Sequence, residues 1–175
     1  FSFCLVDLGV PNFNPTKLRR DGTLVGLTSD GMSSTLGTWK NGVLTAYPRR
    51  LLPPEPNPIQ PRDIDERGRA LYGFWYGTVA RSWLFDGPGD AGVTFIDEFV
   101  GSQITDTGVV LGGKHFPESR PGEEDDYLRS AIYDGAVTPF PDGVRVAYID
   151  ERGVACGGRD NGQGVTPELF PGGPL

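Results

Sequence analysis

The sequence predicts an all-β fold made of four repeats, namely a small β-propeller of about four blades. Its 175 residues include 26 glycines and 16 prolines, which leaves little room for long helices. These residues alternate with short β-branched and aromatic stretches, a pattern typical of strands joined by turns. A motif centred on glycine also recurs four times at intervals of propeller-blade length.

The first half of the repeat is an apolar residue, three mostly polar residues, a glycine and a short apolar stretch. It occupies residues 18–26, 64–73, 104–112 and 149–157, with one extra residue in the second copy. The central glycines are Gly22, Gly68, Gly108 and Gly153, at steps of 46, 40 and 45 residues. Because glycine readily adopts positive φ, each half-motif predicts a strand end, a tight turn and a returning strand.

The second half of the repeat is a strand that runs into another turn. It occupies residues 38–42, 83–87 and 131–135, with a weaker copy at 169–172. The Asn-Gly and Asp-Gly pairs predict type I′ hairpins, each followed by a fourth strand at residues 43–47, 93–96 and 137–140. We therefore predict one domain over residues 1–175, with repeats at about 10–50, 51–100, 101–141 and 142–175, and residues 1–9 supplying the strand that closes the last blade. An open β-array, a fragment of a larger ring and an oligomer of half-rings are alternatives.

These motifs resemble the bacterial extracellular repeats called HAF repeats, in which an Ile-Asn-Asp-x-Gly-x-Val-Val-Gly stretch alternates with an aromatic-Trp-x-Asn-Gly stretch. The resemblance covers nearly the whole chain. Asp, Thr or Arg stands where the family usually has Asn, and the His-Ala-Phe triplet is replaced at residues 36–38, 81–83 and 129–131. The resemblance implies a propeller-like, exported protein in the periplasm or at the cell surface. It implies no catalytic residues.

Two insertions are expected to share one face of the propeller. The turn glycines of the third copy are 27 positions apart where those of the other copies are 19 or 20 apart, and residues 51–61 form a proline-rich connection after the first repeat. Long loops on one face of a rigid scaffold are where binding usually occurs, although simple surface decoration would look the same. The predicted partner- or ligand-binding residues are Pro53, Pro54, Pro56, Pro58, Phe74, Trp75, Tyr76, Phe116, Glu123, Glu124, Asp125 and Asp126.

Each group within this set has a second interpretation. The prolines favour a polyproline II strap or a stiff spacer. The rings at 74–76 could fill a partner's pocket or stack on sugars, but could equally pack between blades. The carboxylates suffice in number for Ca²⁺ but lack the alternating spacing of a calcium loop, so a solvated acidic loop is the simpler interpretation.

The residue types argue against catalysis and against nucleic-acid binding. His115 is the only histidine and no Gly-x-Ser-x-Gly elbow occurs, so we predict no catalytic, metal or cofactor site. Residues 108–115 have the glycine and lysine spacing of a phosphate loop, but a strand of the repeat occupies them. The net charge of −7 with scattered basic residues disfavours nucleic acid. No apolar run is long enough to span a bilayer, so membrane association would need a partner or an unseen anchor, and a Cys4–Cys156 disulfide stays open.

The combined interpretation is a non-catalytic protein-interaction or scaffold module, such as an accessory subunit of an exported or cell-envelope complex. The alternative is a glycan-binding propeller that uses Trp39, Trp75 or Trp83. A carbohydrate-active enzyme with two carboxylates is a third interpretation.

Overall fold

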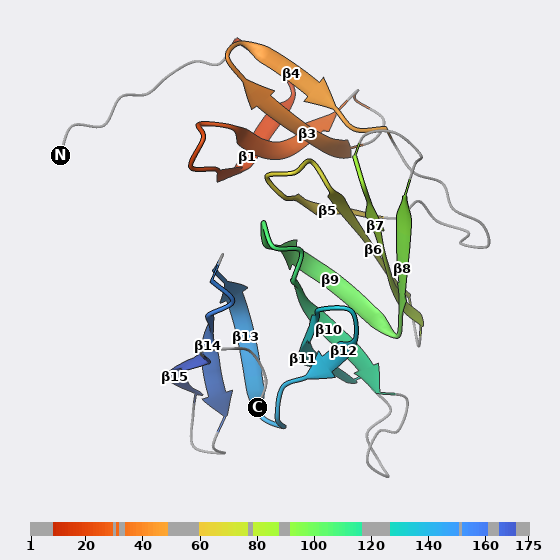
Figure 1. The fold of residues 1–175 in the computed structure, drawn as a ribbon, viewed down its shortest axis with the longest axis vertical. Coiled ribbons are helices and arrows are strands. Elements are labelled where there is room, and N and C mark those ends of the chain that lie inside the picture. The colour runs from red at the N-terminus through yellow and green to blue at the C-terminus, as the bar shows by residue number, and fades with distance from the viewer. Residues whose placement is uncertain are drawn as a thin grey trace, which may run out of the picture. The chain divides into compact units, whose positions relative to one another are not determined.

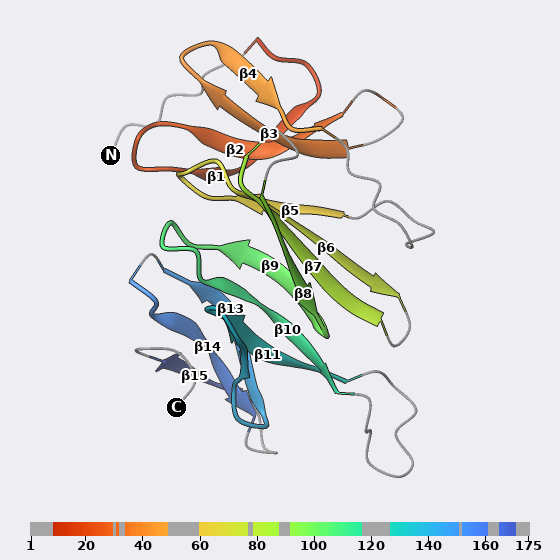
Figure 2. The same ribbon diagram turned by 45° about the vertical axis from the view of Figure 1, so that its right-hand side comes forward.

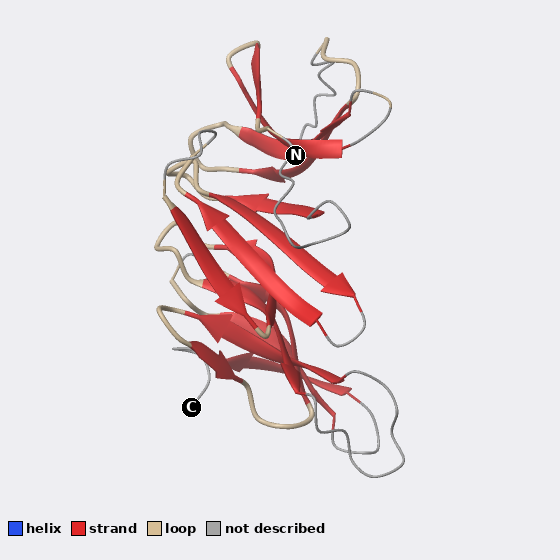
Figure 3. Ribbon diagram, turned by 90° about the vertical axis from the view of Figure 1, so that its right-hand side faces the viewer, coloured by secondary structure: helices blue, strands red, loops and turns tan. Residues whose placement is uncertain are grey.

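The computed structural model describes residues 9–29, 31, 34–48, 60–76, 79–87, 92–116, 127–150, 152–160 and 165–170. These residues form strands, turns and bends, and no helix occurs among them (Figure 3). The predicted all-β class is therefore confirmed.

The strands form four antiparallel meanders, in which neighbours in the chain are neighbours in the sheet (Figure 1). The first contains β1 (Phe13–Leu18), β2 (Leu24–Ser29), β3 (Ser34–Lys40) and β4 (Val43–Ala46). The second contains β5 (Gln60–Ile64), β6 (Ala70–Tyr76), β7 (Val79–Phe85) and β8 (Val93–Asp97). The third contains β9 (Phe99–Ile104), β10 (Val110–Phe116), β11 (Tyr127–Tyr133) and β12 (Val137–Pro139). The fourth contains β13 (Val144–Ile149), β14 (Ala155–Asp160) and β15 (Val165–Phe170).

There are four sheets, as many as the predicted repeats, and β9 begins at Phe99, before the predicted start of the third repeat at about residue 101. The chain divides into two compact units, Phe1–Pro61 and Arg62–Leu175, with the boundary inside β5. The predicted closing strand at residues 1–8 lies outside the described residues, as does Cys4, so strand closure and the disulfide stay predictions.

Within the second unit, neighbouring sheets pack face to face through apolar clusters (Figure 2). Leu71 and Leu84 of the β5–β8 sheet pack with Val110 of the next sheet. Leu111 points to the other side and packs with Ile149 and Ala155 of the β13–β15 sheet. In the three sheets of this unit, we call the side that carries Leu71, Leu111 or Cys156 the trailing face and the opposite side the leading face.

The turn between the first and second strands is the same in all four sheets. At Gly22, Gly68, Gly108 and Gly153 the φ angle is 81°, 84°, 100° and 80°, and each glycine N–H donates to the carbonyl three residues earlier. The prediction of positive φ at these glycines is confirmed. Of the three hairpins predicted at Asn-Gly and Asp-Gly pairs, the one at Asn41-Gly42 has the predicted two-residue turn. The φ values are 51° at Asn41 and 82° at Gly42.

The two Asp-Gly pairs were wrongly predicted to be type I′ hairpins. The loop at Asp86 extends to Gly92, whose carbonyl accepts the Asp86 N–H, and a three-residue loop follows β11 at residues 134–136. Neither aspartate has positive φ in the structure, although a type I′ turn requires it at both central residues.

A bulge in the first strand explains a second glycine in the half-motif. The register shifts between Pro15 and Lys17, between Gly101 and Gln103, and between Val146 and Tyr148. The backbone of the bulged strand then passes so close to Gly26, Gly112 and Gly157 that a Cβ there would collide with it. In the second copy Tyr72, not Gly73, occupies this place, since Ala70 pairs with Phe85 as Val110 pairs with Tyr133. The extra residue predicted for that copy is therefore wrong.

A serine in the third strand joins each of two sheets to the next one. Ser82 Oγ accepts from the Gly101 N–H at 2.7 Å and donates to the Phe99 carbonyl at 3.0 Å. Ser130 Oγ accepts from the Val146 N–H at 2.9 Å. Gly101 and Val146 each lie three residues before the isoleucine that begins the half-motif, so the two hydrogen bonds occupy equivalent positions of the repeat.

A second repeating bond uses the residue just before that isoleucine. Asp63 Oδ2 accepts from the Ile104 N–H at 3.1 Å, and Gln103 Oε1 accepts from the Ile149 N–H at 3.3 Å. Ile104 and Ile149 are almost fully buried, so these side chains satisfy backbone donors that water does not reach.

Candidate binding surface

The structure separates the predicted binding residues into three groups. Pro53, Pro54, Pro56, Pro58, Glu123, Glu124, Asp125 and Asp126 lie outside the described residues. Phe74 is only 6% exposed and belongs to the core, so its predicted place on the binding face is wrong. Trp75 and Tyr76 are exposed, and Phe116 is half-buried.

Trp75 and Tyr76 are two exposed rings at the end of β6, and they point to opposite faces of the sheet because side chains alternate along a strand. The five residues before them in the strand are buried, but Trp75 is 51% and Tyr76 is 71% exposed. Their partners across the sheet are the small residues Ala80 and Val79 at the start of β7. The pair therefore projects from a strand that is fixed along most of its length by the core.

An arginine near the start of β7 lies beside this pair in the same sheet. The Arg81 guanidinium lies 6.0 Å from the centroid of the Phe95 ring and 3.4 Å from a carboxylate oxygen of Asp97. Asp97 is the last residue of β8, so the ion pair joins β7 to the strand end that leads to the next sheet.

The same arrangement recurs in the β9–β12 sheet. Arg129 lies 4.4 Å over the Phe116 ring and 2.6 Å from a carboxylate oxygen of Asp142, and Lys114 Nζ lies 5.3 Å from the same ring. A cation over an aromatic face is attracted by the ring quadrupole. Two cations thus approach the Phe116 ring at the end of β10.

We call Trp75, Tyr76, Arg81, Asp97, Phe116, Arg129 and Asp142 the loop-end residues, because they lie where β6 and β10 end, where β7 and β11 begin, and where the chain leaves β8 and β12. Sequence reasoning found the rings but missed the arginines. The available signal was the dipeptide Arg-Ser, which occurs at 81–82 and again at 129–130, where the structure uses arginine at the loop end and serine between sheets.

The tryptophans differ in their capacity to meet a ligand. Trp83 is 7% exposed and packs at 5.6 Å from Phe95, so it cannot present its face to a sugar. Trp39 is half-buried, and Trp75 is the tryptophan with the larger exposed area.

The described residues contain no group of three His, Cys, Asp or Glu side chains that could hold a metal ion. His115 is 4% exposed within β10, and its backbone N–H donates to the Glu98 carbonyl. Arg81 and Arg129 each form an ion pair, with Asp97 and Asp142 respectively.

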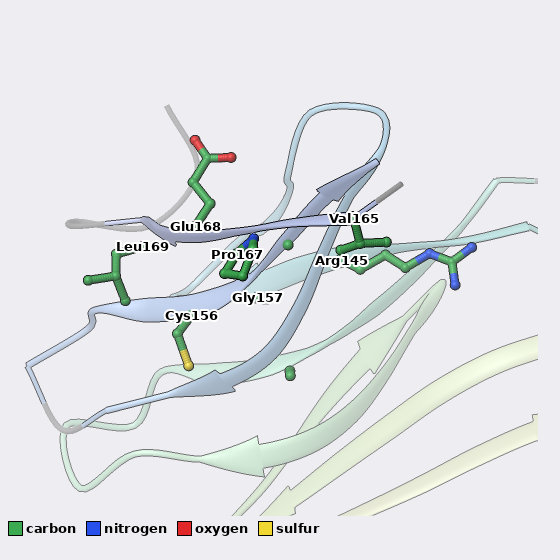
Figure 4. Close-up of a pocket in the computed structure, with 9 residues that line it drawn as sticks. Arg145, Cys156, Gly157, Val165, Pro167, Glu168 and Leu169 are labelled. Atoms are coloured by element: carbon green, nitrogen blue, oxygen red, sulfur yellow. The ribbon is translucent and has the colours of Figure 1, made fainter. Parts of the chain in front are cut away.

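The trailing face of the β13–β15 sheet carries a groove of about 560 Å³ (Figure 4). Its lining includes Arg145, Cys156, Val165, Pro167 and Leu169. Among the described residues, no fourth strand pairs with β15 in the way that β4, β8 and β12 pair with their neighbours.

No protein-family model, curated protein or solved structure matches this chain. In the part of the chain that the structure describes, no helix is long and apolar enough to cross a membrane.

Proposed function

We propose that this chain is a non-catalytic protein-interaction module that binds a partner through its loop-end residues, as a scaffold or accessory subunit of an exported or cell-envelope complex. The observation that supports it is the pair Trp75 and Tyr76, which are 51% and 71% exposed at the end of a strand that is otherwise buried. Aromatic residues and arginine dominate the binding energy of protein interfaces. Here both types are held on ordered strands, which reduces the entropy lost on binding.

The proposed architecture is a four-blade β-propeller in which each sheet is one blade and residues 1–9 provide the fourth strand of the last blade. The register of the fourth strands supports this proposal. Leu44-Thr45-Ala46-Tyr47, Val93-Thr94-Phe95-Ile96 and Val137-Thr138-Pro139-Phe140 occupy equivalent places, and Tyr47, Ile96 and Phe140 at their ends are buried. Phe1-Ser2-Phe3-Cys4 has the same order of apolar, hydroxyl, variable and apolar residues.

Affinity capture from the source cells tests the function. A protein retained by the wild-type chain should be lost with the double variant Trp75→Ala and Tyr76→Ala, and calorimetry with the purified pair should show a dissociation constant at least about 30-fold weaker. Val43→Ser, which changes another exposed apolar residue, should bind like the wild type. Equal binding by the aromatic double variant would exclude this surface as the interface.

A glycan-binding module is the second candidate, since the exposed Trp75 ring could stack on a sugar. It requires a glycan-array ligand whose binding disappears in Trp75→Ala. Array binding that survives this substitution would contradict it.

A further inference from the structure

Two cations lie directly opposite each other near the loop end of the β9–β12 sheet. Lys114 of β10 pairs in register with Arg129 of β11. Lys114 Nζ lies 5.3 Å and Arg129 Cζ lies 4.4 Å from the centroid of the Phe116 ring. Like charges at directly opposite positions of an antiparallel pair destabilise a sheet. The ring attracts both cations and offsets part of this repulsion.

One of these two cations has a carboxylate partner. Asp142 lies 2.6 Å from Nη1 of Arg129. Among the described residues, Lys114 Nζ forms no ion pair and no hydrogen bond, not even with the exposed Glu98 in the connection to β9. The surface beside Phe116 therefore presents a positive charge without a carboxylate partner, in a chain whose net charge is −7.

This pair of opposite cations is specific to the β9–β12 sheet. The pairs at the equivalent position of the other three sheets are Thr28–Thr35, Phe74–Arg81 and Arg159–Thr166. Each of the two arginines in those pairs has a carboxylate of its own, Asp97 or Glu168. Lys114 thus adds a second charge at a position where the other sheets balance a single arginine or carry none.

Trp75 lies on the side of the β5–β8 sheet that faces these cations. It is an even number of positions after Leu71 in β6, so both side chains point to the trailing face. Leu71 packs there with Val110 of β10, and Lys114 is an even number of positions after Val110 on the same side of β10. An indole that is 51% exposed and the two cations are therefore on facing sides of neighbouring sheets within one compact unit.

We propose that Lys114, Arg129 and Trp75 bind an acidic segment of the protein partner. Its carboxylates meet the two cations, and an apolar group beside them meets the indole. Asp142 contacts Nη1 of Arg129, and a guanidinium has five N–H donors, so Arg129 can bind a second carboxylate. This inference rests on the proposed protein-interaction function and specifies the chemistry of the partner.

Charge complementarity identifies this occupant. A chain of net charge −7 repels an acidic segment over most of its surface, so the two cations attract it at one place and fix its orientation. An acidic glycan fits less well, because the Arg129 guanidinium already lies 4.4 Å over the Phe116 ring. This ring therefore positions the cation and does not stack on a sugar.

Titration of the purified full chain with hexaglutamate tests the proposal, with hexaglutamine as the uncharged probe of equal length. We expect hexaglutamate to bind at about 10 mM salt, where the Debye length is about 30 Å, and to dissociate at about 1 M salt, where it is about 3 Å. Hexaglutamine should not bind. NMR shifts of the Lys114 and Arg129 amides locate the complex, and calorimetry gives its dissociation constant. Absence of hexaglutamate binding at low salt would overturn the proposal.

Lysine variants assign the binding to the cation pair. Lys114→Met should weaken hexaglutamate binding by at least about fivefold, and Lys114→Arg should keep it near the wild-type value because the charge is retained. Lys40→Met is the matched control, since it removes the same charge from a lysine that is paired with Asp21, and it should bind like the wild type. Equal binding by Lys114→Met and the wild-type chain would overturn the assignment.

Two other outcomes would overturn the choice of occupant. If oligogalacturonate binds with the same dependence on Lys114 and hexaglutamate does not, the ligand is an acidic glycan. If hexaglutamate binds only after acidic residues of the chain itself are neutralised, those residues occupy the cations in place of a partner. The variant for this test carries Glu123→Gln, Glu124→Gln, Asp125→Asn and Asp126→Asn.

Affinity capture separates this inference from the proposed function. A partner that is retained by the wild-type chain and by Lys114→Met, but lost with Trp75→Ala and Tyr76→Ala, would overturn the acidic segment and leave the interaction module standing. A hexaglutamate complex that depends on Lys114, in a chain that captures no partner, would support the cation surface and contradict the proposed function.

Discussion

At Gly112, the backbone of the bulged strand β9 passes so close that there is no room for a side chain. A Cβ on Gly112 would collide with the Val100 carbonyl and lie 2.8 Å from the Gly101 Cα. Because backbone atoms cannot move aside as a side-chain end can, the bulged strand must shift or the pairing must break.

We therefore expect Gly112→Ala to lower the free energy of unfolding by about 1–3 kcal/mol, the usual effect of overpacking. Gly37→Ala is the matched control, since a Cβ there would meet its neighbours at 3.4 to 3.5 Å, an ordinary contact. Urea unfolding of both variants measures the difference. Equal stability of the two variants would show that the backbone at Gly112 has room.

Asp21, in the first turn, is a carboxyl whose pKa is strongly lowered by its neighbours. A hydrogen bond from Lys40 Nζ at 2.5 Å, and further bonds from the Thr23 N–H and hydroxyl, hold the pKa of this carboxyl well below its usual range. Because the pKa of Asp21 is lower in the folded than in the unfolded chain, its contacts stabilise the fold at any pH above the unfolded-state pKa. This stabilisation is lost as the pH falls through the folded-state pKa.

Carboxyl NMR titration should find the Asp21 midpoint below the ordinary value of about 3.9. Lys40→Met should raise the Asp21 pKa toward that value, because it removes the largest cause of the shift. Lys114→Met, which changes a lysine that lies beside the Phe116 ring, should leave the midpoint unchanged. A normal midpoint in the wild-type chain would refute the pairing.

At the scale of elements, a single hydroxyl joins two sheets. Ser82 is fully buried, and its Oγ accepts a hydrogen bond from the Gly101 N–H of the next sheet. We expect Ser82→Ala to cost about 1–3 kcal/mol in unfolding free energy, the usual penalty for leaving a buried donor unpaired. Thr94→Ala removes an exposed hydroxyl from the adjacent strand β8 and should change stability by less than about 0.5 kcal/mol. Thermal unfolding compares the two, and a neutral Ser82→Ala would show that water replaces the hydroxyl.

The predictions for the strands and turns were correct where a single residue type determines the local backbone conformation. The turn glycines with positive φ and the alternation of short strands fixed the four meanders, because only glycine adopts such φ values without strain. The Asp-Gly hairpins were wrong because the same dipeptide also fits longer loops, and the loop length depends on how β8 and β12 pair with the preceding strands. The place of Tyr72 was wrong because glycine spacing alone cannot show a strand register.

The candidate site was predictable only in part for the same reason. Trp75 and Tyr76 stand out as rings at a strand end, but the exposure that separates them from Phe74 depends on tertiary packing, which the strand pattern does not report. Arg81 and Arg129 could not be recognised from the sequence because the carboxylates that pair with them lie 13 or more residues away in the chain. Pairing across such a distance is a tertiary effect that local pattern does not report.

At the scale of the whole molecule, the bonds between sheets are not distributed evenly along the chain. The β5–β8, β9–β12 and β13–β15 sheets are joined in series by Ser82, Ser130, Asp63 and Gln103. In the first sheet the equivalent residues are Leu36 and Lys17, and neither side chain has an acceptor atom. The chain also divides into two compact units, Phe1–Pro61 and Arg62–Leu175.

The division into two compact units predicts that the β1–β4 sheet opens without the rest of the chain. We expect native-state hydrogen exchange to give β2 and β3 a lower opening free energy than β6 and β10, and a weaker dependence on denaturant, because fewer residues are exposed in a local opening than in global unfolding. Ser130→Ala is the matched control: it should lower protection in β13–β15 by removing the bond to Val146 and leave β2 and β3 unchanged. If the most protected amides of all four sheets instead open with one free energy and one denaturant dependence, then the four sheets unfold as a single cooperative unit and the prediction is wrong.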